Sequence, residues 1–191
     1  MIQEGESEES WSTFFESLKE RELTGLQLVI SDAHKGLIAA IRKNFINVAW
    51  QRCQVHFLRN ILSKIPKKGS KDFRESVKAL FRLTSIDTAR TMKSHLLEEY
   101  MDQIKYTKAC ETLDEGFEDA FQYIVAGQGH NRLKSTNLLE RLNQEVRRRE
   151  KVIRIFPNHA SANRLIGAVL MDKSEEWLSS TRKYILKHSI N

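Results

Sequence analysis

Proline is scarce in this chain, and its scarcity constrains the fold more than any other feature. The 191 residues include only two prolines, Pro66 and Pro157. Because proline breaks the interior of a helix, the long stretches without it are free to form helices, and helix should dominate the fold. Between residues 71 and 125, apolar side chains recur at helical spacing without an interrupting strand pattern. This stretch is therefore predicted to be helical throughout.

The first third of the chain alternates helical periodicity with short apolar runs. Residues 26–30 form an apolar run with β-branched side chains between Gly25 and Ser31, which is typical of a buried strand. Ser7 is placed to cap the first helix. The predicted order is helix 7–21, strand 26–30, helix 35–44, strand 48–52 and helix 54–65. This alternation predicts a mixed sheet flanked by helices.

The last third returns to helical periodicity after a break at Gly127 and Gly129. A helix is predicted from about Asn137, and it should end before Pro157. Two more helices are predicted to follow, through Tyr184.

Composition and charge narrow the classes of function. Lysine and arginine number 31 against 25 acidic residues, a formal net charge of +6, and this mild basic excess fits a nucleic-acid partner. Five arginines and one lysine lie between residues 141 and 154. No window is apolar enough to span a bilayer, and the acidic start does not resemble a signal peptide. We therefore expect a soluble, cytoplasmic protein without a membrane partner, in which Cys53 and Cys110 are reduced.

Three segments carry residues suited to chemistry, and the first is Ser-Asp-Ala-His-Lys-Gly at residues 31–36. Asp32 follows the predicted strand directly, at the strand end where sites form in open α/β sheets. A carboxylate there can ligate Mg²⁺, which prefers oxygen ligands. The alternative is that Asp32 caps the following helix, and the local sequence alone favours this cap.

The second segment is Trp-Gln-Arg-Cys-Gln-Val-His at residues 50–56. Cys53 and His56 lie three residues apart, on one face if the segment is helical. The spacing suits two zinc ligands, but a closed zinc site needs four, and Cys110 and His130 are isolated in the sequence. A structural or hydrogen-bonding pair near the site is the favoured interpretation.

The third segment, residues 134–149, predicts an amphipathic helix rich in arginine. Its core face would carry Leu138, Leu139, Leu142 and Val146. Glu140 and Arg147 would lie away from that face, where a carboxylate beside a guanidinium can hold a metal and steady a phosphate. The alternative, favoured by local sequence alone, is a capping box of Asn137 and Glu140 with the arginines as a solvated face.

Taken together, the segments resemble a known family. The strings SDAHKGL, WQRCQVHFLRNI, STNLLERLNQEVRRR with IFPN after it, and RLIGAVLMDKSEEW follow the order and spacing of the Mutator family of bacterial insertion-sequence transposases. The resemblance implies an α/β, mostly helical chain with a partial RNase H-like fold and a large all-helical insertion. Residues 1–66 would form the C-terminal part of the sheet with flanking helices. Residues 67–129 would form the insertion, and residues 130–191 the returning helices with the last catalytic acid.

The resemblance also implies DNA cleavage and strand transfer by an Asp/Asp/Glu site that binds two divalent ions, Mg²⁺ or Mn²⁺. Asp32 matches the second aspartate and Glu140 the glutamate, so both are expected to be catalytic metal ligands. Their carboxylates should then lie within about 12 Å of each other, and Glu145 facing Asp32 instead would make Glu140 the wrong choice. Cys53 and His56 match the family's Cys-x-x-His signature.

The implied partner is DNA, as transposon ends and as target, and the complete protein is expected to form a homo-oligomer. DNA-binding residues are predicted around the third segment: Arg132, Lys134, Asn137, Arg141, Arg147, Arg148 and Arg149.

The family's first catalytic aspartate lies upstream of SDAHKGL, on the first strand of the sheet. We therefore expect a chain that is truncated at its N-terminus and inactive alone. One alternative is a non-catalytic remnant that binds DNA or an intact transposase. Another is a helical interaction protein with no role on DNA.

Overall fold

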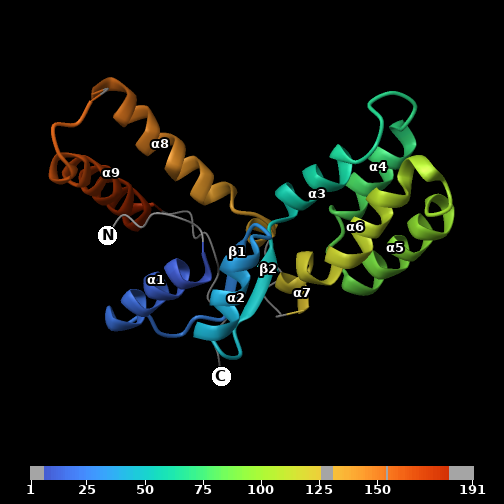
Figure 1. Cartoon of the computed structure of the whole chain (residues 1–191), viewed down its shortest axis with the longest axis horizontal. Helices are drawn as coiled ribbons and strands as arrows, with labels where there is room; N and C mark the ends of the chain where they lie inside the picture. Colours follow the sequence, from blue (N-terminus) through green and yellow to red (C-terminus); the bar gives the residue numbers. More distant parts are fainter. Residues whose placement is uncertain (1–6, 126–130, 154, 181–191) are drawn as a thin grey trace. The chain divides into compact units, whose positions relative to one another are not determined.

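The computed structural model describes residues 7–125, 131–153 and 155–180. This part of the chain is mainly helical and contains one two-stranded parallel sheet (Figure 1). The predicted mostly helical fold with a sheet is confirmed at this level, whereas the RNase H-like assignment stays a prediction. The chain divides into two compact units, residues 1–136 and residues 137–191.

The sheet of the first unit has the two strands that the sequence predicts. β1 (Leu28–Ser31) and β2 (Ala49–Arg52) run parallel and pair residue by residue from one end to the other. They are joined through α2 (Lys35–Asn44), which has the bounds predicted for it. β1 begins two residues later than predicted, and most of its residues are half-buried rather than buried, because β2 is the one strand paired with it in the described structure.

The N-terminal helix α1 (Glu8–Glu20) packs against α2. Ser7 caps it as predicted, since its hydroxyl accepts a hydrogen bond from the backbone N–H of Ser10 at 3.1 Å. The two helices and β2 share a small apolar core of Phe15, Leu37, Ala40, Ile41 and Trp50. This core fixes α2, and with it the chain at the end of β1.

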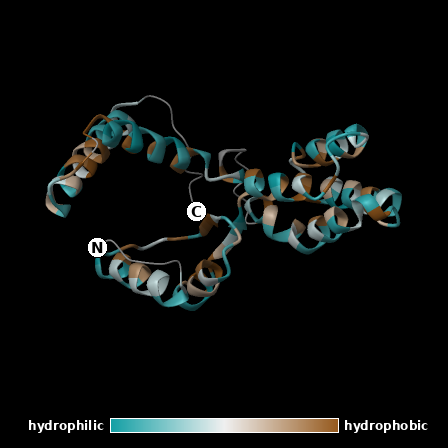
Figure 2. Ribbon diagram, turned by 45° about the horizontal axis from the view of Figure 1, so that its top comes forward, coloured by the Kyte–Doolittle hydropathy of each residue, from teal (hydrophilic) through white to brown (hydrophobic). Residues whose placement is uncertain are grey.

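The rest of the described part of the first unit is helical, as predicted for residues 71–125. It consists of α3 (Gln54–Ser63), α4 (Lys71–Leu80), α5 (Ile86–Tyr100), α6 (Ile104–Ala120), α7 (Gln122–Val125) and the 3₁₀ helix η1 (Asn131–Lys134). Hydrophobic and hydrophilic residues alternate along these helices (Figure 2), as expected when each buries one face. Their larger core includes the stacked pairs Phe73 with Tyr106 and Phe117 with Phe121, whose ring centroids lie 4.7 Å apart in both.

Two glutamines attach these helices to the sheet. The buried Gln51, in β2, donates a hydrogen bond to the carbonyl oxygen of Ala120 at 2.6 Å and accepts one from the N–H of Tyr123 at 2.9 Å. Gln54, at the start of α3, donates to the same Ala120 carbonyl at 2.7 Å. A buried polar group needs such partners, so the end of α6 is held beside the end of β2.

The described residues of the second unit form α8 (Asn137–Ile153) and α9 (His159–Ser179). The side chain of Asn158 caps α9 by accepting from the N–H of Ser161 at 2.9 Å. The sequence predicted two helices after Pro157, but the described residues form one continuous helix. The expectations for Gly127, Gly129, His130 and Tyr184 lie outside the described residues.

The predicted core face of α8 is not buried. Leu138 and Leu139 are 46% and 55% exposed, and no residue of α8 is buried. The physical reason is the small number of neighbours: within its unit α8 packs against α9, and one helix cannot cover a broad apolar face. No helix in the described ranges is long and apolar enough to cross a membrane.

Candidate active site

A cavity of about 160 Å³ lies at one edge of the sheet. Because β1 and β2 are parallel, their carboxyl ends meet at this edge, where Asp32 follows β1 and Cys53 follows β2. The lining residues are Asp32, Ala33, Arg52, Cys53, His56, Phe57 and Asn60. The first two segments singled out in the sequence are therefore brought together in one pocket.

The backbone at Asp32 is held by buried polar contacts, while its side chain is exposed. The hydroxyl of Ser31 donates to the Asp32 carbonyl oxygen at 2.8 Å and accepts from Nε1 of Trp50 at 2.9 Å. The N–H of Cys53 donates to the Ser31 carbonyl at 2.7 Å. These bonds fix the backbone at the end of β1, and with it the Cα position from which the Asp32 side chain extends.

The local alternative for Asp32, an N-cap, is wrong. α2 begins at Lys35, its N-cap position is His34, and no side chain accepts a capping hydrogen bond there. Two residues separate Asp32 from the first helical residue, which is too far for a residue that must directly precede the helix. The Asp32 carboxylate is thus not committed to the helix that follows it.

Cys53 and His56 occupy different surroundings within the pocket wall. Cys53 is fully buried, and its Sγ accepts a hydrogen bond from the hydroxyl of Thr136 at 3.5 Å. His56 lies half-buried in the first turn of α3. Within the described ranges no group of three or more histidine, cysteine or acidic residues is placed to hold a metal; Asp32 is the carboxylate among the pocket's lining residues.

Arg52 adds a positive charge to the pocket wall. Its guanidinium carbon lies 4.2 Å from the ring centroid of Phe57, an attractive cation–π distance. Burial lowers the pKa of Arg52, and the nearby carboxylates of Asp119 and Glu115 oppose this. Burial raises the pKa of Asp119, against the effect of Arg42 and Arg52. A guanidinium has a very high ordinary pKa, so Arg52 remains a cation here.

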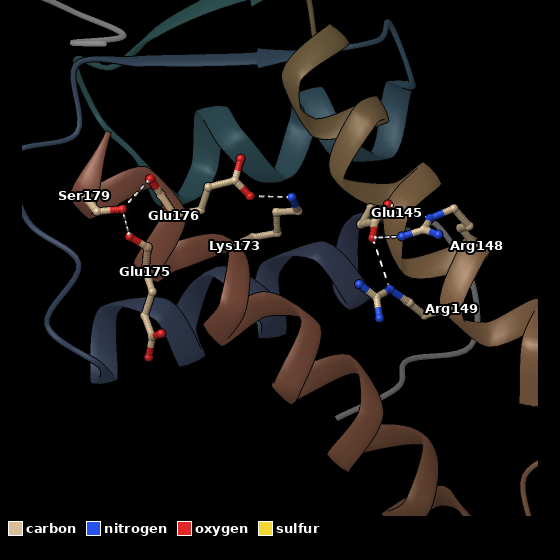
Figure 3. A network of polar contacts seen from close by, with 7 residues as sticks. All are labelled: Glu145, Arg148, Arg149, Lys173, Glu175, Glu176 and Ser179. Atoms are coloured by element: carbon tan, nitrogen blue, oxygen red, sulfur yellow. Dashed lines mark hydrogen bonds and ion pairs between the residues drawn. The ribbon is translucent and has the colours of Figure 1, made fainter. Parts of the chain in front are cut away.

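Glu145, the alternative to Glu140 as the catalytic glutamate, is bound by arginines of its own helix α8. Its carboxylate accepts hydrogen bonds from Arg148 at 2.7 and 3.0 Å and from Arg149 at 3.2 Å (Figure 3). These two partners lower the pKa of Glu145 to about 2. Glu140 lies five residues earlier on the same helix and is half-buried. The convergence of Glu140 with Asp32 stays a prediction.

The predicted DNA-binding residues differ in their exposure and in their contacts. Arg141, Arg147, Arg148 and Arg149 are exposed on α8, and Asn137 is its exposed first residue. Nζ of Lys134 donates to the Phe81 carbonyl at 3.3 Å and lies 5.7 Å from the Tyr123 ring centroid, and burial lowers the pKa of Lys134. The side chain of Arg132 lies outside the described part of the structure.

Sequence reasoning missed Arg52 and Asn60 as pocket residues. Arg52 could have been found, because it ends the predicted strand 48–52 directly before Cys53. Asn60 lies one turn beyond His56 on the same helix face, a spacing that was also visible in the sequence. Gln51 gave a weaker signal, a polar residue inside a strand, and its partners are about 70 residues away.

Comparison with known proteins gives consistent matches. The family model described as Transposase, Mutator family matches residues 1–180. The chain is 71% identical over 185 residues to the transposase for insertion sequence element IS256 in transposon Tn4001 of Staphylococcus aureus, covering 97% of this chain and 47% of that protein. It is 39% identical over 178 residues to the transposase for insertion sequence element ISRM5 of Rhizobium meliloti, covering 93% and 44%. The chain spans about half the length of the curated relatives it matches.

Proposed function

This chain belongs to the Mutator family of transposases, and on that basis we propose that it forms part of the active site of an insertion-sequence transposase. The proposed activity is cleavage and transfer of DNA strands by an Asp/Asp/Glu site on an RNase H-like fold. The observation that carries the proposal is the exposed carboxylate of Asp32 in a pocket at the carboxyl edge of a parallel sheet.

Asp32 meets the requirements for a ligand of Mg²⁺ or Mn²⁺. Its carboxylate is exposed and caps no helix, and its backbone is fixed by Ser31. Mg²⁺ takes oxygen ligands and few protein carboxylates, which one aspartate and a second acid can supply. When bound, two such ions would supply activation of the attacking hydroxyl and stabilisation of the leaving oxygen.

Glu140 is the proposed second carboxylate of this chain. The engagement of Glu145 by Arg148 and Arg149 argues against Glu145, because a carboxylate held by two guanidinium groups would have to release them to bind a metal. Glu140 is the residue that matches the glutamate of the family motif. Its placement in the first turn of α8 sets it on a rigid element, which suits a group that must be held in position.

The positive residues give the chain means to hold DNA beside these acids. Arg52 presents a guanidinium in the pocket that holds Asp32, and we assign it a phosphate contact near the reacting group. The exposed arginines 141, 147, 148 and 149, with Arg132, Lys134 and Asn137, would contact the phosphate backbone farther along the DNA. The Lys134 ammonium must give up its contact with Phe81 to do so.

The test is DNA cleavage by this chain, alone and with the N-terminal half of the staphylococcal relative supplied in trans. The DNA carries the ends of that relative's insertion sequence element, and Mn²⁺ is the metal. We expect metal-dependent nicking in the mixture, lost in the variants D32N and E140Q and retained in E150Q. Glu150 is a matched control because it is an exposed glutamate on the same helix.

Two outcomes would contradict the proposal. Nicking that survives D32N or E140Q would place the catalytic acids elsewhere. DNA binding without nicking, both by the chain alone and in the mixture, would support a non-catalytic binding role. The expectation that the chain is inactive alone is wrong if it nicks DNA unaided and E140Q abolishes the cut.

A further inference from the structure

A hydrogen bond links the Cys-x-x-His signature to the start of the second unit. The hydroxyl of Thr136 donates to Sγ of Cys53 at 3.5 Å, across 83 residues of sequence. Thr136 is the last residue of the first unit, and α8 begins at the next residue. The bond therefore lies within the first unit, at the point where the chain leaves it.

Residues 133–136, here called the lead-in segment, are anchored at three places. Leu133 packs against the larger helical core, and Lys134 donates to the Phe81 carbonyl. Thr136 makes the third contact, with Cys53, and it is the anchor nearest to α8. The 3₁₀ helix of residues 131–134 and the residues after it are thus held along the first unit rather than free of it.

Cys53, the partner of Thr136, also belongs to the pocket. It follows β2, is fully buried, and lines the same cavity as Asp32. Its backbone is held on both sides: its N–H donates to Ser31, and its carbonyl accepts from Phe57 at 3.0 Å. A thiol fixed in this way sets the position of whatever hydroxyl it accepts from.

We propose that Cys53 is a positioning residue, which through Thr136 fixes the point beside the pocket from which α8, with Glu140, departs. Glu140 follows Thr136 by four residues, about one helical turn of roughly 5.4 Å. The inference rests on the proposed function in taking Glu140 as a metal ligand. Placement matters there, because a misplacement of about 1 Å can cost about a hundredfold in rate.

The test is labelling of the native thiols, with each cysteine followed by mass spectrometry. Cys53 and Cys110 are both buried, so Cys110, in α6, reports general opening of the helical core. Thr136→Val keeps the volume and removes the donor, and it should raise the labelling rate of Cys53 about threefold to tenfold, the effect of losing one modest hydrogen bond. Cys110 should not change.

Two variants serve as controls. Thr136→Ser retains the hydroxyl and should restore the slow labelling of Cys53. Thr91→Val removes a hydroxyl that bonds within its own helix α5 and should leave both rates unchanged. Equal acceleration at both cysteines in Thr136→Val, or no change at Cys53, would overturn the inference.

The positioning role is tested by measuring the affinity of the protein and its variants for Mn²⁺. Thr136→Val should weaken Mn²⁺ binding severalfold, and Thr136→Ser should not. Faster labelling of Cys53 with unchanged Mn²⁺ affinity would mean that Cys53 holds the lead-in segment without positioning Glu140, and this overturns the proposal. Mn²⁺ binding that is insensitive to D32N and E140Q would overturn the proposed function instead, while the labelling pattern would still decide whether Cys53 anchors α8.

Discussion

Replacing Gly116 with alanine should destabilise the first unit, although alanine is the better helix former. A Cβ atom at this position of α6 would lie 2.3 Å from Nη1 of Arg52 and 2.7 Å from both Cε2 and Cζ of Phe57. The end of the Arg52 side chain can move, but the Phe57 ring is buried in the larger core. The close approach of α6 to β2 and α3 therefore depends on the absence of a side chain.

The size of the effect follows from two opposing terms. Overpacking a core costs about 1–3 kcal/mol, while alanine gains about 1 kcal/mol over glycine in helix propensity. Because two of the three close contacts are with a ring that has little room to move, we expect a net loss of about 1–2 kcal/mol. In a unit of this size that is a decrease of about 3–8 °C in Tm.

The assay is thermal unfolding by far-UV circular dichroism, with hydrogen exchange of peptides from α6 to locate the change. Gly167→Ala is the matched control, because Gly167 lies within α9 and a Cβ there would meet no atom within 4 Å. It should raise the stability of the second unit by up to about 1 kcal/mol. If Gly116→Ala raises the Tm as Gly167→Ala does, the packing account of α6 is refuted.

Three further predictions concern buried and charged groups. Gln51→Leu leaves the buried N–H of Tyr123 without its acceptor and should cost about 1–3 kcal/mol in urea unfolding; an unchanged midpoint would count against it. Arg147→Ala should flatten the log–log salt dependence of DNA binding by about one unit. Arg148→Ala, which removes a guanidinium already bound to Glu145, should flatten it less, and equal slopes would argue against this ranking. Because the pKa of Glu145 is lowered to about 2, its charge supports the folded helix above the ordinary value of 4.5 and this support is lost as the pH falls through about 2. A carboxyl titration by NMR with a midpoint near 4.5 would exclude the two ion pairs.

Local signals in the sequence predicted the elements of the first unit well. Helix 35–44 has the predicted bounds, and Ser7 caps α1 because a serine before acidic residues suits a helix start. Residues 71–125, all of which the structure describes, contain no strand, as their periodicity indicated. The failure at α8 has another cause: an apolar face predicts burial only when something covers it, and periodicity does not contain that information.

The site was predictable in its parts and less so in its contacts. Asp32 was correctly placed at the end of a strand. Its local sequence favoured a helix cap, because aspartate is a preferred N-cap residue, but the cap position belongs to His34. Cys53 and His56 were expected near the site, and they line the same pocket as Asp32. The bond from Thr136 to Cys53 joins residues 83 apart, and no local pattern reveals such a pair.

The central claim is that Asp32 and Glu140 are ligands of the same metal site. The most direct measurement is a crystal structure of this chain grown with Mn²⁺, with the ion located by its anomalous scattering. We predict that both carboxylates bind Mn²⁺ in one site, through a single ion or through two ions about 4 Å apart, so that the two groups lie within about 12 Å of each other. Carboxylates that lie farther apart in a well-ordered structure, or Glu145 at the ion in place of Glu140, would contradict the account.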